Sequence, residues 1–68
     1  MITRLLFGDI GGTNTRIASG LFNAENDLII EHIHIYQSAD YSSFQDILTL
    51  FLNTYQLDKK IFTQYALR

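Results

Sequence analysis

The sequence predicts a small α/β unit in which a three-stranded antiparallel meander is followed by an amphipathic helix. Two observations carry this prediction. Three apolar segments are separated by two short turns, and they span residues 4–10, 15–22 and 28–37. From residue 42 onward the apolar positions recur instead at spacings of three and four, which is the period of one helix face.

The first segment is apolar enough for a strand that is buried on both faces, and Gly11-Gly12 ends it. Glycine tolerates positive φ, so paired glycines between apolar runs indicate a hairpin turn. The second strand places Ile17, Ser19 and Leu21 on one face. A polar turn rich in Asn and Asp, residues 23–27, then leads into the third strand.

Alternation divides the third strand between two faces. One face holds Ile30, His32, His34 and Tyr36, and the other holds Ile29, Glu31, Ile33 and Ile35. His32 and His34 could suit a metal ion, but no third ligand is near them in the sequence. We therefore expect the two histidines to lie on a solvent-facing edge.

The helix is expected over roughly residues 43–56. Its apolar face consists of Phe44, Ile47, Leu48, Phe51, Leu52 and Tyr55. Ser42 and Gln45 have the form of a capping box, and Asp46 places a carboxylate in the first turn. In the tail, residues 58–68, the apolar Ile61, Phe62, Tyr65 and Leu67 could begin another strand or a short helical turn, but they follow neither period clearly.

Composition excludes several classes of function. The net charge of −2 offers no basic patch for nucleic acid. No apolar run approaches the ~20 residues that span a bilayer, and no signal peptide is visible, so we expect a cytoplasmic protein. The chain has 68 residues and no cysteine. A chain this short buries only about 60% of its unfolded surface, so we expect exposed apolar surface that could also pair two copies.

The segment from Gly8 to Arg16 carries the chemistry. A buried strand delivers Asp9 to its end, and Gly11-Gly12 keep side chains out of the turn, so an anion can approach the main-chain amides. Thr13 and Asn14 add side-chain donors. A carboxylate beside a phosphate needs a cation between them, and Mg²⁺ meets this need. The arrangement suits Mg-ATP.

Two other phosphate-binding motifs are excluded. The Gly-Lys-Ser/Thr ending of a P-loop is missing, and the spacing of Gly8, Gly11 and Gly12 is not that of a dinucleotide fingerprint. A plain hairpin, whose glycines only satisfy turn geometry, is the alternative for a bare Asp-x-Gly-Gly.

Residues 9–16, Asp-Ile-Gly-Gly-Thr-Asn-Thr-Arg, resemble the first phosphate motif of sugar kinases in the actin, heat-shock ATPase and hexokinase superfamily. Asn14, Arg16 and the opening Leu-Leu-Phe-Gly-Asp-Ile are most similar to the bacterial glucokinase family. The stretch 40–44, leading into the helix, is similar as well. The resemblance covers residues 4–57 and only the beginning of a whole glucokinase.

The resemblance implies a ribonuclease-H-like (actin-like ATPase) fold, of which residues 1–68 would form a partial amino-terminal nucleotide-binding domain with a divergent tail, 58–68. It implies that the ATP phosphates are lined by Gly8, Asp9, Ile10, Gly11, Gly12, Thr13 and Asn14. Main-chain amides of residues 10–13 would be the donors, and Asp9 would hold Mg²⁺ through water. Arg16 would either pair with a carboxylate of a second domain or serve as a structural surface arginine.

In this family the catalytic aspartate and the residues that bind the sugar lie downstream of residue 68, so no catalytic residue is assigned. The full-length protein would phosphorylate glucose with ATP, and we expect this chain alone to be inactive. Truncation or a change of reading frame near Ile61 would explain the divergent tail. Rival interpretations are another sugar kinase or repressor of the superfamily, a small non-catalytic α+β module that binds phosphate or a partner, and a decayed gene product.

Overall fold

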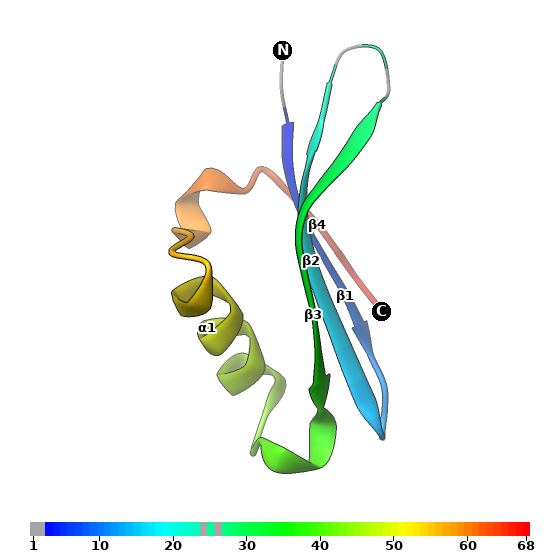
Figure 1. The fold of residues 1–68 in the computed structure, drawn as a ribbon, viewed down its shortest axis with the longest axis vertical. Coiled ribbons are helices and arrows are strands. Elements are labelled where there is room, and N and C mark those ends of the chain that lie inside the picture. The colour runs from blue at the N-terminus through cyan, green and yellow to red at the C-terminus, as the bar shows by residue number, and fades with distance from the viewer. Residues whose placement is uncertain (1–2, 24, 26) are drawn as a thin grey trace.

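A computed structural model describes residues 3–23, 25 and 27–68, and in them a four-stranded sheet is covered on one face by an α-helix (Figure 1). The strands are β1 (Thr3–Ile10), β2 (Asn14–Phe22), β3 (Leu28–Gln37) and β4 (Gln64–Leu67). The helical elements are η1 (Ser38–Asp40), α1 (Phe44–Thr54) and η2 (Lys59–Ile61). The predicted meander and helix are confirmed, each to within about two residues at its ends.

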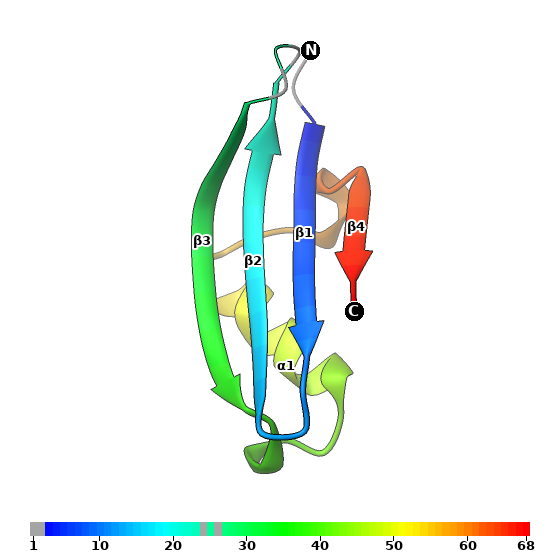
Figure 2. The same cartoon turned by 90° about the vertical axis from the view of Figure 1, so that its right-hand side faces the viewer.

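The sheet has the order β3-β2-β1-β4 (Figure 2). β1 and β2 are antiparallel, as are β2 and β3, whereas β4 lies parallel to β1 with Tyr65 opposite Leu6. The tail therefore contains both a short 3₁₀ turn and a strand. Its residues showed no period because all of β4 is exposed and only its backbone is paired at the sheet edge.

The turn between β2 and β3 is organised by Asn23. Its side-chain Oδ1 accepts hydrogen bonds from the amides of Glu25 and Asp27, at 2.9 and 3.0 Å. This is the Asx chemistry that the sequence predicted. Ala24 and Asn26, within the predicted turn, lie outside the described residues.

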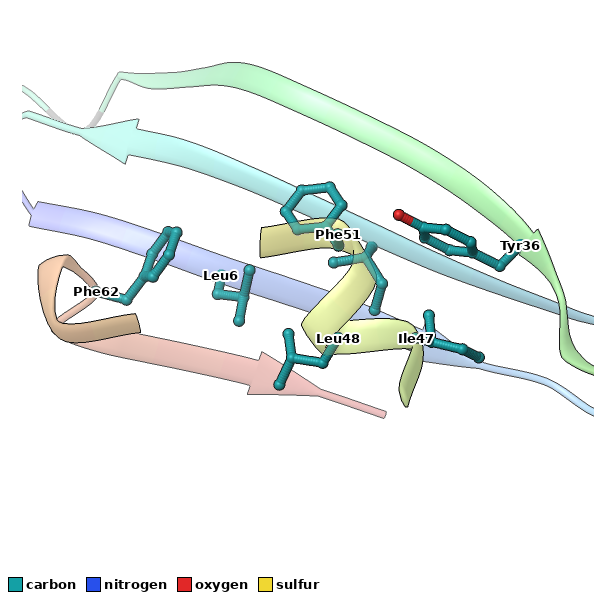
Figure 3. Packing of buried hydrophobic residues seen from close by; sticks show 7 residues of the cluster. Leu6, Tyr36, Ile47, Leu48, Phe51 and Phe62 are labelled. Atoms are coloured by element: carbon teal, nitrogen blue, oxygen red, sulfur yellow. The ribbon is translucent and has the colours of Figure 1, made fainter. Parts of the chain in front are cut away.

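The core lies between α1 and the sheet (Figure 3). Its buried residues are Leu6, Ile17, Tyr36, Ile47, Leu48, Phe51 and Phe62. The three helix members are the ones that the apolar spacing predicted, and Phe51 is fully buried. Burying a side chain of this size stabilises the fold by about 1.5–3 kcal/mol.

The N-cap of helix α1 lies one residue later than predicted. Ser43, not Ser42, is the N-cap, and its Oγ accepts a hydrogen bond from the amide of Asp46 at 3.3 Å. The capping box assigned to Ser42 and Gln45 was therefore wrong. Both serines have a polar residue three positions later, so the sequence alone could not show which serine is the N-cap.

Helix α1 ends in a Schellman motif. Gln56 has a φ of 54°, the amide of Leu57 donates to the carbonyl of Leu52 at 2.8 Å, and the amide of Gln56 donates to Asn53 at 3.3 Å. Glycine is the usual residue at this left-handed position, so Gln56 stores strain there. Neither α1 nor any other helix in the described part of the chain is long and apolar enough to span a membrane.

A β-bulge in β3 changes which of its residues share a face. Consecutive residues of β2 pair with His32 and then with Ile30, so Glu31 is an extra residue in the ladder. Glu31 turns to the helix side, where its carboxylate pairs with the guanidinium of Arg4 at 3.0 Å. The predicted faces of residues 29–31 were wrong, because alternation in a sequence cannot reveal an inserted residue.

Among the described residues, no helix covers the face of the sheet opposite α1 (Figure 1). Its β3 side chains are about half exposed: Leu28 45%, Ile30 46%, Ile33 54% and Ile35 55%. The expectation of exposed apolar surface is confirmed. We call this surface, formed by Leu28, Ile30, Ile33 and Ile35, the open face.

Candidate functional site

The predicted site residues gather at one end of the sheet, in the turn that joins β1 to β2. Asp9 and Ile10 end β1, Asn14 begins β2, and the residues between them form the turn. Residues 9–14 are all exposed, so a large ligand can reach them.

Gly8 differs from the other predicted site residues because it is buried in β1. A Cβ atom there would lie 2.8 Å from the side chain of Leu67 and 3.4 Å from that of Ile17. The absence of a side chain at Gly8 therefore lets β4 and the core pack closely. The structure places Gly8 next to the exposed turn but not on its surface.

The two glycines of the turn have different roles. A Cβ on Gly11 would lie only 2.6 Å from the carbonyl oxygen of Asn14, whereas a Cβ on Gly12 would meet nothing within 4 Å. Neither glycine has a positive φ. The hairpin was predicted from glycine's tolerance of positive φ, and this reason was wrong. Gly11 is required instead because the backbone of Asn14 approaches it closely, whereas the fold has room for a side chain at Gly12.

The main-chain amides of the turn divide into two pairs. Ile10 donates to the carbonyl of Arg68 and Gly11 to that of Asn14, both at 2.9 Å. The amides of Gly12 and Thr13 donate no hydrogen bond within the described part of the chain. Of the four amides that the resemblance implied as donors, the structure leaves these two available to a ligand.

Ser38 holds the turn from the end of β3. Its amide donates to the carbonyl of Thr13 at 3.0 Å, and its Oγ donates to the carbonyl of Gly11 at 2.7 Å. The Oγ also lies 2.8 Å from the hydroxyl of Thr15, which is 1% exposed. Sequence reasoning missed Ser38, because a single serine 27 residues from Gly11 belongs to no motif.

Asp9 lies opposite Arg16 in the β1–β2 ladder, and no ion pair joins the two among the described residues. Both line a shallow hollow of about 340 Å³, together with Arg68 and apolar residues of the sheet. Two guanidinium groups and the carboxylate of Asp9 therefore belong to residues that line one hollow. The exposed side chain of Arg16 leaves both expectations for its role open.

The two histidines lie on the edge strand β3, where His34 is exposed and His32 is half-buried, so the expected solvent-facing edge is confirmed for His34. The ring of His32 stacks on that of Tyr55 with centroids 4.4 Å apart. His34 Nδ1 lies 3.3 Å from the Tyr55 hydroxyl. The sequence did not show that Tyr55, at the end of α1, contacts both rings. No group of three metal-ligating side chains occurs among the residues described here.

A meander followed by a helix and a parallel fourth strand, with a glycine turn in the first hairpin, defines a ribonuclease-H-like (actin-like ATPase) fold. The glucokinase family model matches residues 6–66. The chain therefore belongs to the glucokinase family, and it corresponds to an amino-terminal portion of that fold. The match runs through residue 66, beyond the residues 4–57 that carry the resemblance in the sequence.

A solved glucokinase from an Antarctic psychrotroph is similar to this chain. The two share 36% sequence identity and superpose with a TM-score of 0.75. The similarity covers 94% of this chain and 20% of that glucokinase, so the chain spans about one fifth of its length. No curated protein matches the sequence significantly.

Proposed function

We propose that this chain forms the wall of a glucokinase that binds the ATP phosphates. The observation that carries the proposal is the exposed β1–β2 turn, in which the amides of Gly12 and Thr13 have no partner among the described residues and which follows directly on the exposed Asp9. The whole enzyme would transfer the γ-phosphoryl group of ATP to glucose and yield glucose 6-phosphate, in the cytoplasm and at the start of glycolysis.

The turn has the chemistry that a triphosphate requires. Successive main-chain amides make an anion-binding nest, and Thr13 and Asn14 add a hydroxyl and an amide group at the same end of the sheet. Asp9 is the residue that would hold Mg²⁺. A single exposed carboxylate fits this ion, which keeps several waters and takes its other ligands from phosphate oxygens. When bound, Mg²⁺ neutralises charge on the phosphates.

No catalytic residue is assigned to this chain. Phosphoryl transfer depends largely on positioning and charge stabilisation, and the turn would supply the phosphate part of both. The catalytic base and the residues that select glucose would come from the remainder of the enzyme. The open face would be an interface in the full-length enzyme, or between two copies of this chain.

A chimera tests the proposal. Residues 6–66 replace the matching segment of the Antarctic glucokinase, and glucose-dependent formation of ADP is measured. We expect an active chimera whose rate falls strongly with Asp9→Asn. The matched control is Asp27→Asn, which changes an exposed aspartate in the β2–β3 turn and should leave the rate unchanged.

Two results would contradict the proposal. If the folded chimera bound glucose but formed no ADP, the turn could not serve a kinase. If Asp9→Asn and Asp27→Asn had equal rates, the carboxylate of Asp9 would have no part in the reaction. A chimera without activity whose turn still bound Mg-ATP would favour the non-catalytic phosphate-binding module instead.

A further inference from the structure

Ser38 makes three hydrogen-bonding contacts with the β1–β2 turn although it follows β3 in the sequence. Its amide reaches the carbonyl of Thr13, and its Oγ reaches both the carbonyl of Gly11 and the hydroxyl of Thr15. All three distances are between 2.7 and 3.0 Å. These contacts flank the amides of Gly12 and Thr13, for which the described part of the chain offers no partner.

The direction of each hydrogen bond follows from the chemistry of the groups. A carbonyl oxygen only accepts, so Ser38 must use its single hydroxyl proton on Gly11. The hydroxyl of Thr15 therefore donates to Ser38 Oγ at 2.8 Å. Thr15 is almost fully buried, so the hydrogen bonds from Thr15 to Ser38 and from Ser38 to Gly11 link the interior of the protein to the turn.

The bond to Gly11 sets the direction of the neighbouring amide. The carbonyl of Gly11 and the N–H of Gly12 belong to one peptide unit, which is planar and trans, so the two groups point in opposite directions. Because Ser38 fixes the carbonyl on the protein side, the N–H of Gly12 points away from Ser38.

We propose that Ser38 is a positioning residue that aims the Gly12 amide at the phosphate groups of ATP. This inference rests on the proposed function, since it gives Ser38 a role in the same phosphate-binding turn. Ser38 touches no phosphate itself and acts through the Gly11–Gly12 peptide.

Two measurements on the whole chain test the proposal. The residual dipolar coupling of the Gly12 N–H reports the orientation of that bond without any ligand, and calorimetry with Mg-tripolyphosphate reports affinity. In Ser38→Ala we expect a changed Gly12 coupling, unchanged couplings in β1 and β2, and an affinity about five- to tenfold weaker. Ser38→Thr keeps the hydroxyl and should restore both values. Ser42→Ala changes an exposed serine that makes no hydrogen bond with the turn in the described structure, and it should alter neither.

A further variant separates positioning from general weakening of the hairpin. Thr15→Val keeps the side-chain volume and removes only the proton given to Ser38, so we expect the Gly12 coupling to persist and the affinity to change less than twofold. An equal loss in Thr15→Val and Ser38→Ala would overturn the role of the Gly11 carbonyl. If Ser38→Ala does not fold, Ser38→Cys, which keeps a weak donor, is measured in its place.

The outcomes for Ser38 and for the proposed function are distinguishable. If the unmodified chain binds Mg-tripolyphosphate but Ser38→Ala shows the same coupling and affinity, the positioning role is wrong and the phosphate site stands. If the unmodified chain does not bind, the phosphate site is wrong and the positioning role with it, whatever the coupling shows.

Discussion

Replacing Gly11 by alanine perturbs the turn at a point where the structure has no room. The new Cβ would lie 2.6 Å from the carbonyl oxygen of Asn14, a backbone atom that cannot rotate aside. The same oxygen accepts the Gly11 amide at 2.9 Å. The turn must therefore open, and this hydrogen bond must lengthen or break.

The expected cost follows from three contributions. Loss of the hydrogen bond costs about 0.5–1.5 kcal/mol, and forced displacement of a packed group costs about 1–3 kcal/mol. Replacing glycine with alanine also restricts the unfolded chain, which returns about 0.4–1 kcal/mol. We therefore expect Gly11→Ala to lower the free energy of unfolding by about 1–3 kcal/mol.

Gly12→Ala is the matched control. A Cβ there meets nothing within 4 Å, and no glycine in the chain has a positive φ, so the free energy of unfolding should stay the same or rise by up to about 1 kcal/mol. Urea denaturation followed by circular dichroism measures both variants. Equal stability of Gly11→Ala and Gly12→Ala would refute the steric reasoning. Because Gly12 borders the proposed phosphate site, its variant should also bind Mg-ATP more weakly without being less stable.

Three further predictions concern the rest of the fold. Gln56→Gly should raise the free energy of unfolding by about 0.5–1 kcal/mol, because glycine adopts the left-handed conformation after α1 without strain. Gln45→Gly, inside the helix, should lower the free energy of unfolding by a similar amount. A lower stability of Gln56→Gly would contradict the presence of strain at this residue. Phe51→Ala should cost about 3–5 kcal/mol because this ring is fully buried, while Leu50→Ala, 40% exposed on the same helix, should cost far less, and thermal unfolding compares the two. Burial, together with the nearby Tyr55 and Tyr41, raises the pKa of Tyr36 above 10.0, so the folded state holds this proton more tightly and stability should fall as the pH rises past 10.0. Tyr36→Phe removes a buried hydroxyl that has no partner among the described residues, so it should cost no stability at neutral pH. It should also reduce the loss of stability above pH 10.0. Urea midpoints measured on either side of pH 10.0 would show both effects.

The sequence predicted those elements whose formation depends on residues that are close together in the chain. The apolar face of α1 and the hairpin at Gly11-Gly12 follow from periodicity and turn chemistry, and both were confirmed. The sequence left β4 undecided between a strand and a helical turn, because its four residues are exposed and its position depends on pairing with β1, far away in the sequence. The bulge at Glu31 was missed for a related reason, since an extra residue in a ladder depends on the partner strand.

The candidate site was predicted as a stretch of sequence but not as a set of contacts. Residues 9–14 are together and exposed, as expected from the motif. The motif could not show which amides are already bonded, because the partner of Ile10 is Arg68, at the far end of the chain. Nor could it show Ser38, whose role depends on the end of β3 meeting the turn.

A titration of the isotope-labelled chain with Mg-ATP, followed by amide chemical shifts, tests the phosphate-binding role of the turn most directly. We predict saturable shifts centred on Gly12 and Thr13 that require Mg²⁺ and weaken when Asp9 is changed to asparagine. If the signals of Gly12 and Thr13 stay unchanged at millimolar Mg-ATP while the chain is folded, the turn does not bind phosphate and the proposed function is wrong.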